Sequence, residues 1–113
     1  MTEPRPETPL PEPVASFVAA VNRHDEDAFL DAFTPDGVVD DWGREFAGRD
    51  RIKAWSDKEF IGARGVLTPQ ACRTDGSEVT LVGDWRSNHA NGLSSFVFAV
   101  RGDAISRMTI REG

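Results

Sequence analysis

The sequence predicts an α+β fold in which three N-terminal helices pack on one face of a curved, mostly antiparallel sheet. Up to about residue 60, apolar residues recur at helical spacing. After Gly65 they alternate instead, and Asp75-Gly76 and Asn91-Gly92 mark hairpin turns. We therefore expect a single domain at residues 13–113, because a chain of 113 residues can bury one modest core.

The first two predicted helices form a hairpin. The first begins at Pro13, because the missing N–H of proline costs nothing in a first turn. Its apolar stripe consists of Val14, Phe17, Val18 and Val21. Asp25 is a good N-cap for the second helix, which ends before the turn sequence Thr34-Pro35-Asp36-Gly37.

Five strands and a third helix complete the expected domain. A short strand at residues 38–41 ends at Trp42-Gly43, and the third helix covers residues 49–60. The terminal antiparallel meander has strands at residues 66–74, 78–88, 93–101 and 104–111. Residues 1–12 are rich in Pro and Glu, which predicts a flexible, extended arm outside the fold.

Composition excludes several classes of function. The net charge of -6 argues against nucleic acid and anionic membrane surfaces as partners, because both require clustered Lys and Arg. We see no signal peptide or membrane-spanning stretch, and the single cysteine, Cys72, fits a reducing cytoplasm and a buried, inert thiol. Neither histidine spacing nor glycine motifs predict a metal or a cofactor.

One segment, D-D-W-G-R-E-F-A-G-R-D-R-I at residues 40–52, joins an acidic strand end to a third helix that begins after Gly48. With the helical hairpin and the four late strands, it resembles the nuclear transport factor 2-like superfamily, and within it the SnoaL-like and ketosteroid-isomerase-like branch. The resemblance implies a cone-shaped fold with an apolar pocket at one end. It also implies a homodimer that forms through the sheet. Fold alone does not decide the reaction, because members range from isomerases and cyclases to proteins without catalysis.

The paired acids Asp40 and Asp41 raise the question of which one faces the pocket. Successive side chains of a strand point to opposite faces, so only one can do so, and periodicity does not choose between them. The resemblance assigns the general base to Asp41 and turns Asp40 outward, where water screens it. A carboxylate held away from water among Phe and Trp side chains becomes a stronger base. The alternative is a strand-end carboxylate that is hydrogen-bonded to backbone or to an arginine.

Two positions depart from the ketosteroid isomerases, which use a Tyr and a protonated Asp to stabilise an oxyanion. Phe17 and Phe98 stand near these positions and donate no hydrogen bond, so steroid isomerisation is not expected. Both are instead expected to shape the pocket. The residues expected to join them are Trp42, Trp55 and Trp85. His89 precedes a hairpin turn that can overhang the pocket mouth, and we consider it a second catalytic candidate.

The leading hypothesis is a small soluble pocket protein that binds an apolar, carbonyl-containing molecule, with Asp41 as the base of an isomerase- or cyclase-like reaction. The alternative is a non-catalytic ligand-binding or dimerisation module of the same fold. A third hypothesis, water activation of the epoxide-hydrolase kind, requires two carboxylates with an arginine between them. The sequence offers Asp41 for it but no second acid or arginine that can be placed inside.

Overall fold

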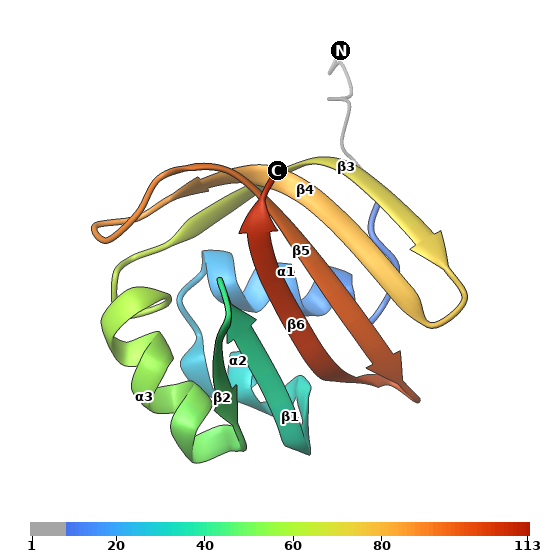
Figure 1. The fold of residues 1–113 in the computed structure, drawn as a ribbon, viewed down its shortest axis with the longest axis horizontal. Helices are drawn as coiled ribbons and strands as arrows, with labels where there is room; N and C mark the ends of the chain where they lie inside the picture. Colours follow the sequence, from blue (N-terminus) through green and yellow to red (C-terminus); the bar gives the residue numbers. More distant parts are fainter. Residues whose placement is uncertain (1–8) are drawn as a thin grey trace.

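The structure is a computed structural model that describes residues 9–113. The predicted arm at residues 1–12 therefore lies mostly outside the described residues; at its described end, Leu10 packs against the core. Helices and strands follow one another along the chain as shown in Figure 1. Their bounds are α1 Val14–Asn22, α2 Glu26–Asp31, β1 Phe33–Asp41, β2 Arg44–Ala47, α3 Arg49–Glu59, β3 Val66–Asp75, β4 Glu78–Arg86, β5 Gly92–Arg101 and β6 Ala104–Glu112.

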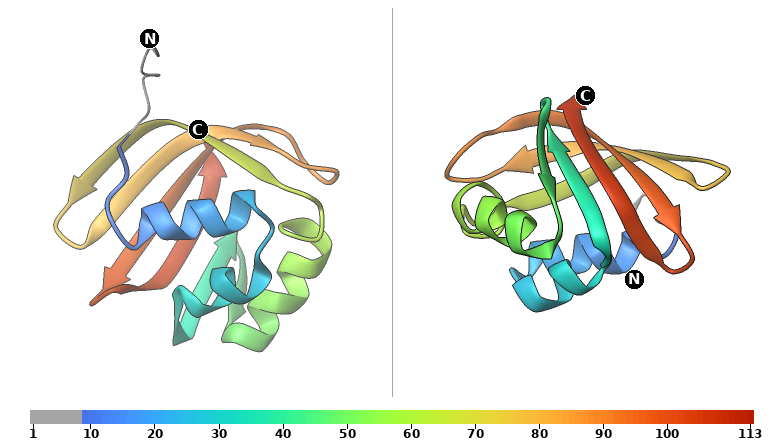
Figure 2. Two further views of the ribbon diagram at one scale, coloured as in Figure 1. Left: turned by 180° about the vertical axis from the view of Figure 1, so that it is seen from behind. Right: turned by 60° about the horizontal axis from the view of Figure 1, so that its bottom comes forward.

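The strands form one six-stranded sheet in the order β2-β1-β6-β5-β4-β3. All neighbouring pairs are antiparallel except β1 and β6, which are parallel. The sheet bends around the helices, and α1 lies across its concave side (Figure 2). The α+β fold with a mostly antiparallel sheet is thus confirmed.

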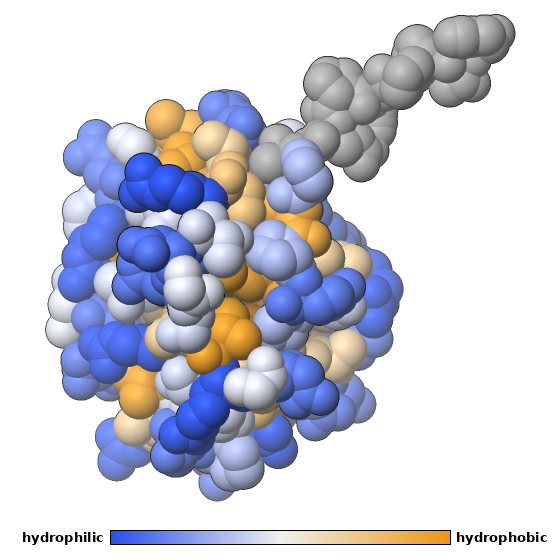
Figure 3. Space-filling view, turned by 90° about the vertical axis from the view of Figure 1, so that its right-hand side faces the viewer, coloured by the Kyte–Doolittle hydropathy of each residue, from blue (hydrophilic) through white to orange (hydrophobic). Residues whose placement is uncertain are grey.

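The core fills the concave side of the sheet. The predicted apolar stripe of α1 is buried, and Phe17 lies at its centre with its ring 5.4 to 5.6 Å from the rings of Phe29, Phe33 and Phe98. Hydrophilic side chains cover most of the face shown in Figure 3, and hydrophobic surface is visible between them in small areas. The helices are short, at nine, six and eleven residues, and none within residues 9–113 has the length and apolarity to cross a membrane.

The segment from residue 33 to residue 47 differs from the sequence prediction. The expected turn at residues 34–37 lies inside β1, where it forms an irregularity: Phe33 pairs with Ile105, whereas Val38 pairs with Arg107. The chain then reverses at Trp42-Gly43 into β2, a strand that the sequence did not predict. As a result α3 follows a β-hairpin, and the three helices do not form a continuous N-terminal block. The late strands match their predicted ranges within two residues.

The β1–β2 hairpin has a two-residue turn with an uncommon residue. Asp41 and Arg44 are directly paired across it, and both turn residues have positive φ, 56° at Trp42 and 93° at Gly43. Such turns favour Asn-Gly, because both central residues must adopt a left-handed conformation. A bulky residue such as Trp is strained there.

We therefore expect Trp42→Asn to stabilise the fold by about 1 kcal/mol, because asparagine tolerates the left-handed conformation. The free energy of unfolding in urea measures this effect. A loss of stability of similar size would contradict the strain assigned to Trp42.

Candidate functional site

A cavity of about 260 Å³ opens between the β1–β2 hairpin, α3 and the β4–β5 connection. Its lining combines aromatic rings with charged side chains. It consists of Asp41, Trp42, Arg44, Trp55, Glu59, Phe60, Trp85, His89, Ala90, Ser94, Phe96 and Ile110. Of the seven residues expected at a site, the structure therefore brings Asp41, Trp42, Trp55, Trp85 and His89 together.

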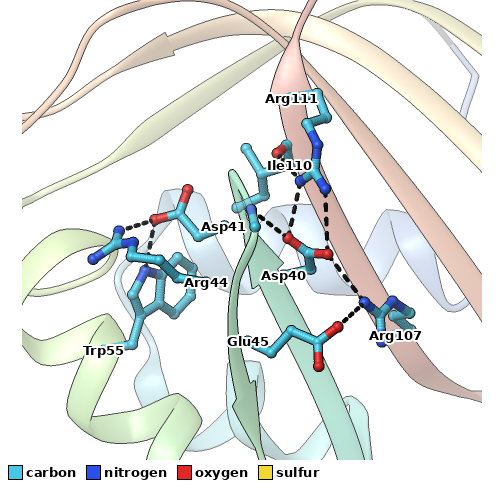
Figure 4. Close-up of polar contacts among 9 residues, drawn as sticks. Asp40, Asp41, Arg44, Glu45, Trp55, Arg107, Ile110 and Arg111 are labelled. Carbon is cyan, nitrogen blue, oxygen red and sulfur yellow. Dashed lines mark hydrogen bonds and ion pairs between the residues drawn. The ribbon is translucent and has the colours of Figure 1, made fainter.

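Asp41 ends β1 and turns toward this cavity with 15 % of its side chain exposed. Its Oδ2 atom accepts hydrogen bonds from Nη2 of Arg44 and from Nε1 of Trp55, the latter at 3.0 Å. Figure 4 shows the second oxygen, Oδ1, directed away from both donors. The carboxylate is thus fixed through one oxygen, while the other makes no hydrogen bond to the described residues.

Arg44 lies between two carboxylates. Besides Asp41 it binds Glu59 of α3 through two hydrogen bonds of 2.6 and 3.1 Å. The hydrogen bonds that Arg44 donates hold the pKa of Glu59 below its usual value, and the acceptance of these bonds by Glu59 raises the pKa of Arg44. Nε2 of His89 lies 3.3 Å from Oε1 of Glu59 at the cavity mouth. Glu59 therefore remains ionised, binds Arg44 and lies beside the His89 ring.

Sequence reasoning missed Arg44 and Glu59. Arg44 could have been found by interpreting D-W-G-R as a hairpin with a two-residue turn. Arg44 then follows the turn directly and pairs with Asp41 across it. For Glu59 we find no comparable signal. It stands in the last turn of a helix whose charges alternate in sign, a pattern typical of a solvated face.

Asp40 faces away from the cavity, as expected, but the expectation that water screens it is wrong. It is only 7 % exposed, and its carboxylate accepts hydrogen bonds from Arg107, Arg111 and the backbone N–H of Gly43 at 3.0, 3.0 and 2.7 Å (Figure 4). Hydrogen bonds from Arg111 chiefly hold the pKa of Asp40 below its usual value. Asp40 thus ties the end of β1 to β6.

One wall of the cavity is a stack of rings. Trp55 and Trp85 flank Phe60, with centroid distances of 4.7 and 4.4 Å and interplanar angles of 26° and 11°. Trp85 reaches this stack because residue 65 is glycine: a Cβ there would lie 2.0 Å from its Cη2 atom. Both faces of Phe60 are covered, so the edge of its ring is the part available to a ligand.

Phe17 and Phe98, which were expected to shape the pocket, lie in the closed core instead. Their rings are 5.4 Å apart and at most 1 % of either residue is exposed, because Phe29 and Phe33 fill the space around Phe17. Cys72 is partly buried, and this burial raises the pKa of its thiol.

Comparisons with known proteins identify one family model and several solved structures of the same fold. The SnoaL-like domain model matches residues 14–113. A Sinorhizobium meliloti protein assigned as a polyketide cyclase is 25% identical, with a TM-score of 0.80 over 90% of this chain and 95% of its own. A protein from Sphaerobacter thermophilus is 29% identical, with a TM-score of 0.71 over 87% and 90%. A computationally designed 17-OHP binder shares the fold at 13% identity, with a TM-score of 0.79 over 88% and 87%. No curated protein matches the sequence.

The lowered pKa of Asp40 predicts a specific pH dependence of stability. A carboxylate with a lowered pKa in the folded state stabilises the fold above its unfolded pKa of about 3.9, and this contribution is lost as the pH falls through the lowered value. We expect Asp40→Asn to cost about 1 to 3 kcal/mol near neutral pH, because two partly exposed arginines lose a charged partner. The difference from the wild type should shrink near pH 3.

Urea unfolding at both pH values measures this difference. Asp103→Asn, an exposed aspartate in the β5–β6 turn, is the matched control and should change stability little at either pH. A deficit of Asp40→Asn that is constant with pH would show that charge on this carboxylate does not support the fold.

Proposed function

We propose that this chain, which belongs to the SnoaL-like domain family, binds a small uncharged carbonyl compound in its cavity and uses Asp41 as a general base. The supporting observation is that Asp41 lines the cavity with one carboxylate oxygen held and one left over: Arg44 and Trp55 bind Oδ2, whereas Oδ1 makes no hydrogen bond within residues 9–113. A base of this kind removes a proton from carbon next to a carbonyl group.

In the proposed step the proton passes from the carbon atom to Oδ1 of Asp41. The C–H electron pair moves into the carbon skeleton, and negative charge develops on the carbonyl oxygen. His89 and Ser94 line the same cavity, and each can donate to this oxygen after turning from its present neighbour, Glu59 for His89 and the carbonyl of Gly92 for Ser94. Arg44 is shared between Asp41 and Glu59, so these three side chains together carry a net negative charge.

The cavity limits the size of the ligand. Its volume of about 260 Å³ lies just below the range of typical ligand pockets, about 300 to 1,000 Å³. Rings of Trp55, Phe60, Trp85 and Phe96 make most of the wall apolar. The cavity therefore suits an uncharged group the size of one ring better than a large polar molecule.

Water activation of the epoxide-hydrolase kind is the second candidate, because Arg44 stands between Asp41 and Glu59 as that mechanism requires. It needs one carboxylate to take a proton from water and the other, protonated, to donate one to the epoxide oxygen. The lowered pKa of Glu59 disfavours a protonated partner, and the Arg44 side chain is 52% exposed rather than deeply buried. We therefore rank this reaction second.

We also propose a homodimer that forms through the outer face of the sheet, either as the assembly of the enzyme or as the main role of a non-catalytic module. Helices cover the other face (Figures 1 and 2). The outer face carries a row of three partly exposed residues that are paired across β4, β5 and β6. They are Thr80, Val97 and Thr109. Flat patches of uncharged β-branched residues suit pairing between sheets.

The dimer proposal predicts that Val97→Arg yields a monomer, because a charge would be buried at the centre of the pairing face. Sedimentation velocity measures the mass. Asp50→Ala, at an exposed position of α3 on the helical side of the sheet, is the control and should remain dimeric. A wild-type monomer would refute this assembly.

The proposed base predicts that the protein accelerates hydrogen–deuterium exchange at the methyl group of acetophenone in D₂O, followed by proton NMR. Asp41→Asn keeps the size of the side chain but removes the base, so we expect the exchange rate to fall by about 100-fold or more.

Asp103→Asn is the matched control, because this exposed aspartate of the β5–β6 turn does not line the cavity and should leave the exchange rate near that of the wild type. Exchange by Asp41→Asn at the wild-type rate would overturn the catalytic role. Binding of acetophenone without exchange by the wild type would instead support the non-catalytic binding module.

A further inference from the structure

Trp42 differs from every other aromatic residue of the chain. All seven Phe residues and both other Trp residues pair with a neighbouring ring, whereas Trp42 makes no such pair within residues 9–113. Its residue is 60% exposed, and it stands in the strained turn between β1 and β2. An aromatic face next to the cavity is thus open.

This residue lies between two hollows. The first is the cavity of Asp41. The second, of about 420 Å³, lies beyond it toward the start of β5 and the end of β6. Both hollows are lined by Trp42, Trp85, Ala90 and Ser94, and the outer one adds Leu93, which is 45% exposed. Shared walls make the two hollows parts of one continuous surface.

We propose that the outer hollow is a second subsite of the same ligand site, in which the flat, unsaturated part of an elongated ligand stacks on Trp42 while its carbonyl end reaches Asp41. This proposal names the ligand class of the proposed function and rests on it for the position of the carbonyl end.

The open ring face determines the kind of group that fits. The stacked Trp55, Phe60 and Trp85 cover one another, so Trp42 offers the free face on which a planar group can lie. Leu93 adds an exposed apolar side chain to the same hollow. Because Glu112 lines the outer hollow and Asp41 and Glu59 line the inner one, an anionic ligand is disfavoured.

The turn conformation supports a binding role for this tryptophan. An Asn at position 42 would form the turn with less strain, so the indole is not there to stabilise the hairpin. Strained residues that persist next to a cavity are characteristic of binding sites. Trp42 fits this description, since it combines a positive φ with contact to both hollows.

Two rigid ketones with the same head test the subsite: acetophenone, with one ring, and 4-acetylbiphenyl, with a second ring in line. Isothermal titration calorimetry gives both dissociation constants. We expect the wild type to bind 4-acetylbiphenyl about 10-fold more tightly than acetophenone, because the second ring stacks on Trp42. Trp42→Asn, which should fold at least as stably, is expected to reduce this ratio to near one.

Leu93→Ala contacts the outer hollow alone, so it should lower the ratio without changing acetophenone affinity. Val66→Ala, an exposed apolar residue that lines neither hollow, should leave the ratio unchanged. A wild-type ratio near one, or a ratio unaffected by both Trp42→Asn and Leu93→Ala, would overturn the subsite. Failure of the general base shows separately, as deuterium exchange that survives Asp41→Asn.

Discussion

The ion pair between Asp41 and Arg44, formed across a two-residue turn, is the contact on which the candidate site depends. Arg44 holds one oxygen of Asp41 and at the same time binds Glu59, so it joins the β1–β2 hairpin to the last turn of α3. Because Arg44 is half exposed, this pair contributes little to global stability. Its importance is geometric: it fixes the direction in which the second oxygen of Asp41 points.

Because successive side chains of β1 point to opposite faces of the sheet, its last two residues, Asp40 and Asp41, have different roles. Asp40 points to the outer face, where Arg107 and Arg111 bind it and anchor the strand to β6. Asp41 points to the concave side and lines the cavity. The ion pairs of Asp40 on the outer face fix the end of β1. The carboxylate of Asp41 on the concave face is thereby held in position, as a general base requires. Thus neither carboxylate is simply solvated, which answers the question raised by the adjacent aspartates in the sequence.

Most of the fold follows from local signals in the sequence. Asp75-Gly76 and Asn91-Gly92 mark hairpins by their turn chemistry, and the stripe on α1 follows from helical spacing. The β1–β2 hairpin was missed because Trp42 occupies a turn position that usually takes Asn. The ligand-binding role that we propose for Trp42 explains why this turn departs from the usual preference for Asn.

The site was less predictable than the fold, because it depends on contacts between distant segments. The alternation of side chains along the strand and the resemblance to known proteins together assigned Asp41 to the pocket. Glu59 comes from another element, α3, and is linked to Asp41 through Arg44. Phe17 was expected in the pocket on the basis of resemblance alone. The rings of Phe29 and Phe33 fill the space beside it, which a comparison of positions does not reveal.

A crystal structure with 4-acetylbiphenyl bound would test the central claim most directly, since it measures the distance between Oδ1 of Asp41 and the methyl carbon of the ligand. The account predicts about 3 to 3.5 Å, the separation of reacting atoms in a productive complex, with the second ring against Trp42. A ligand seated elsewhere, or an Asp41 whose two oxygens are both taken by protein donors, would contradict it.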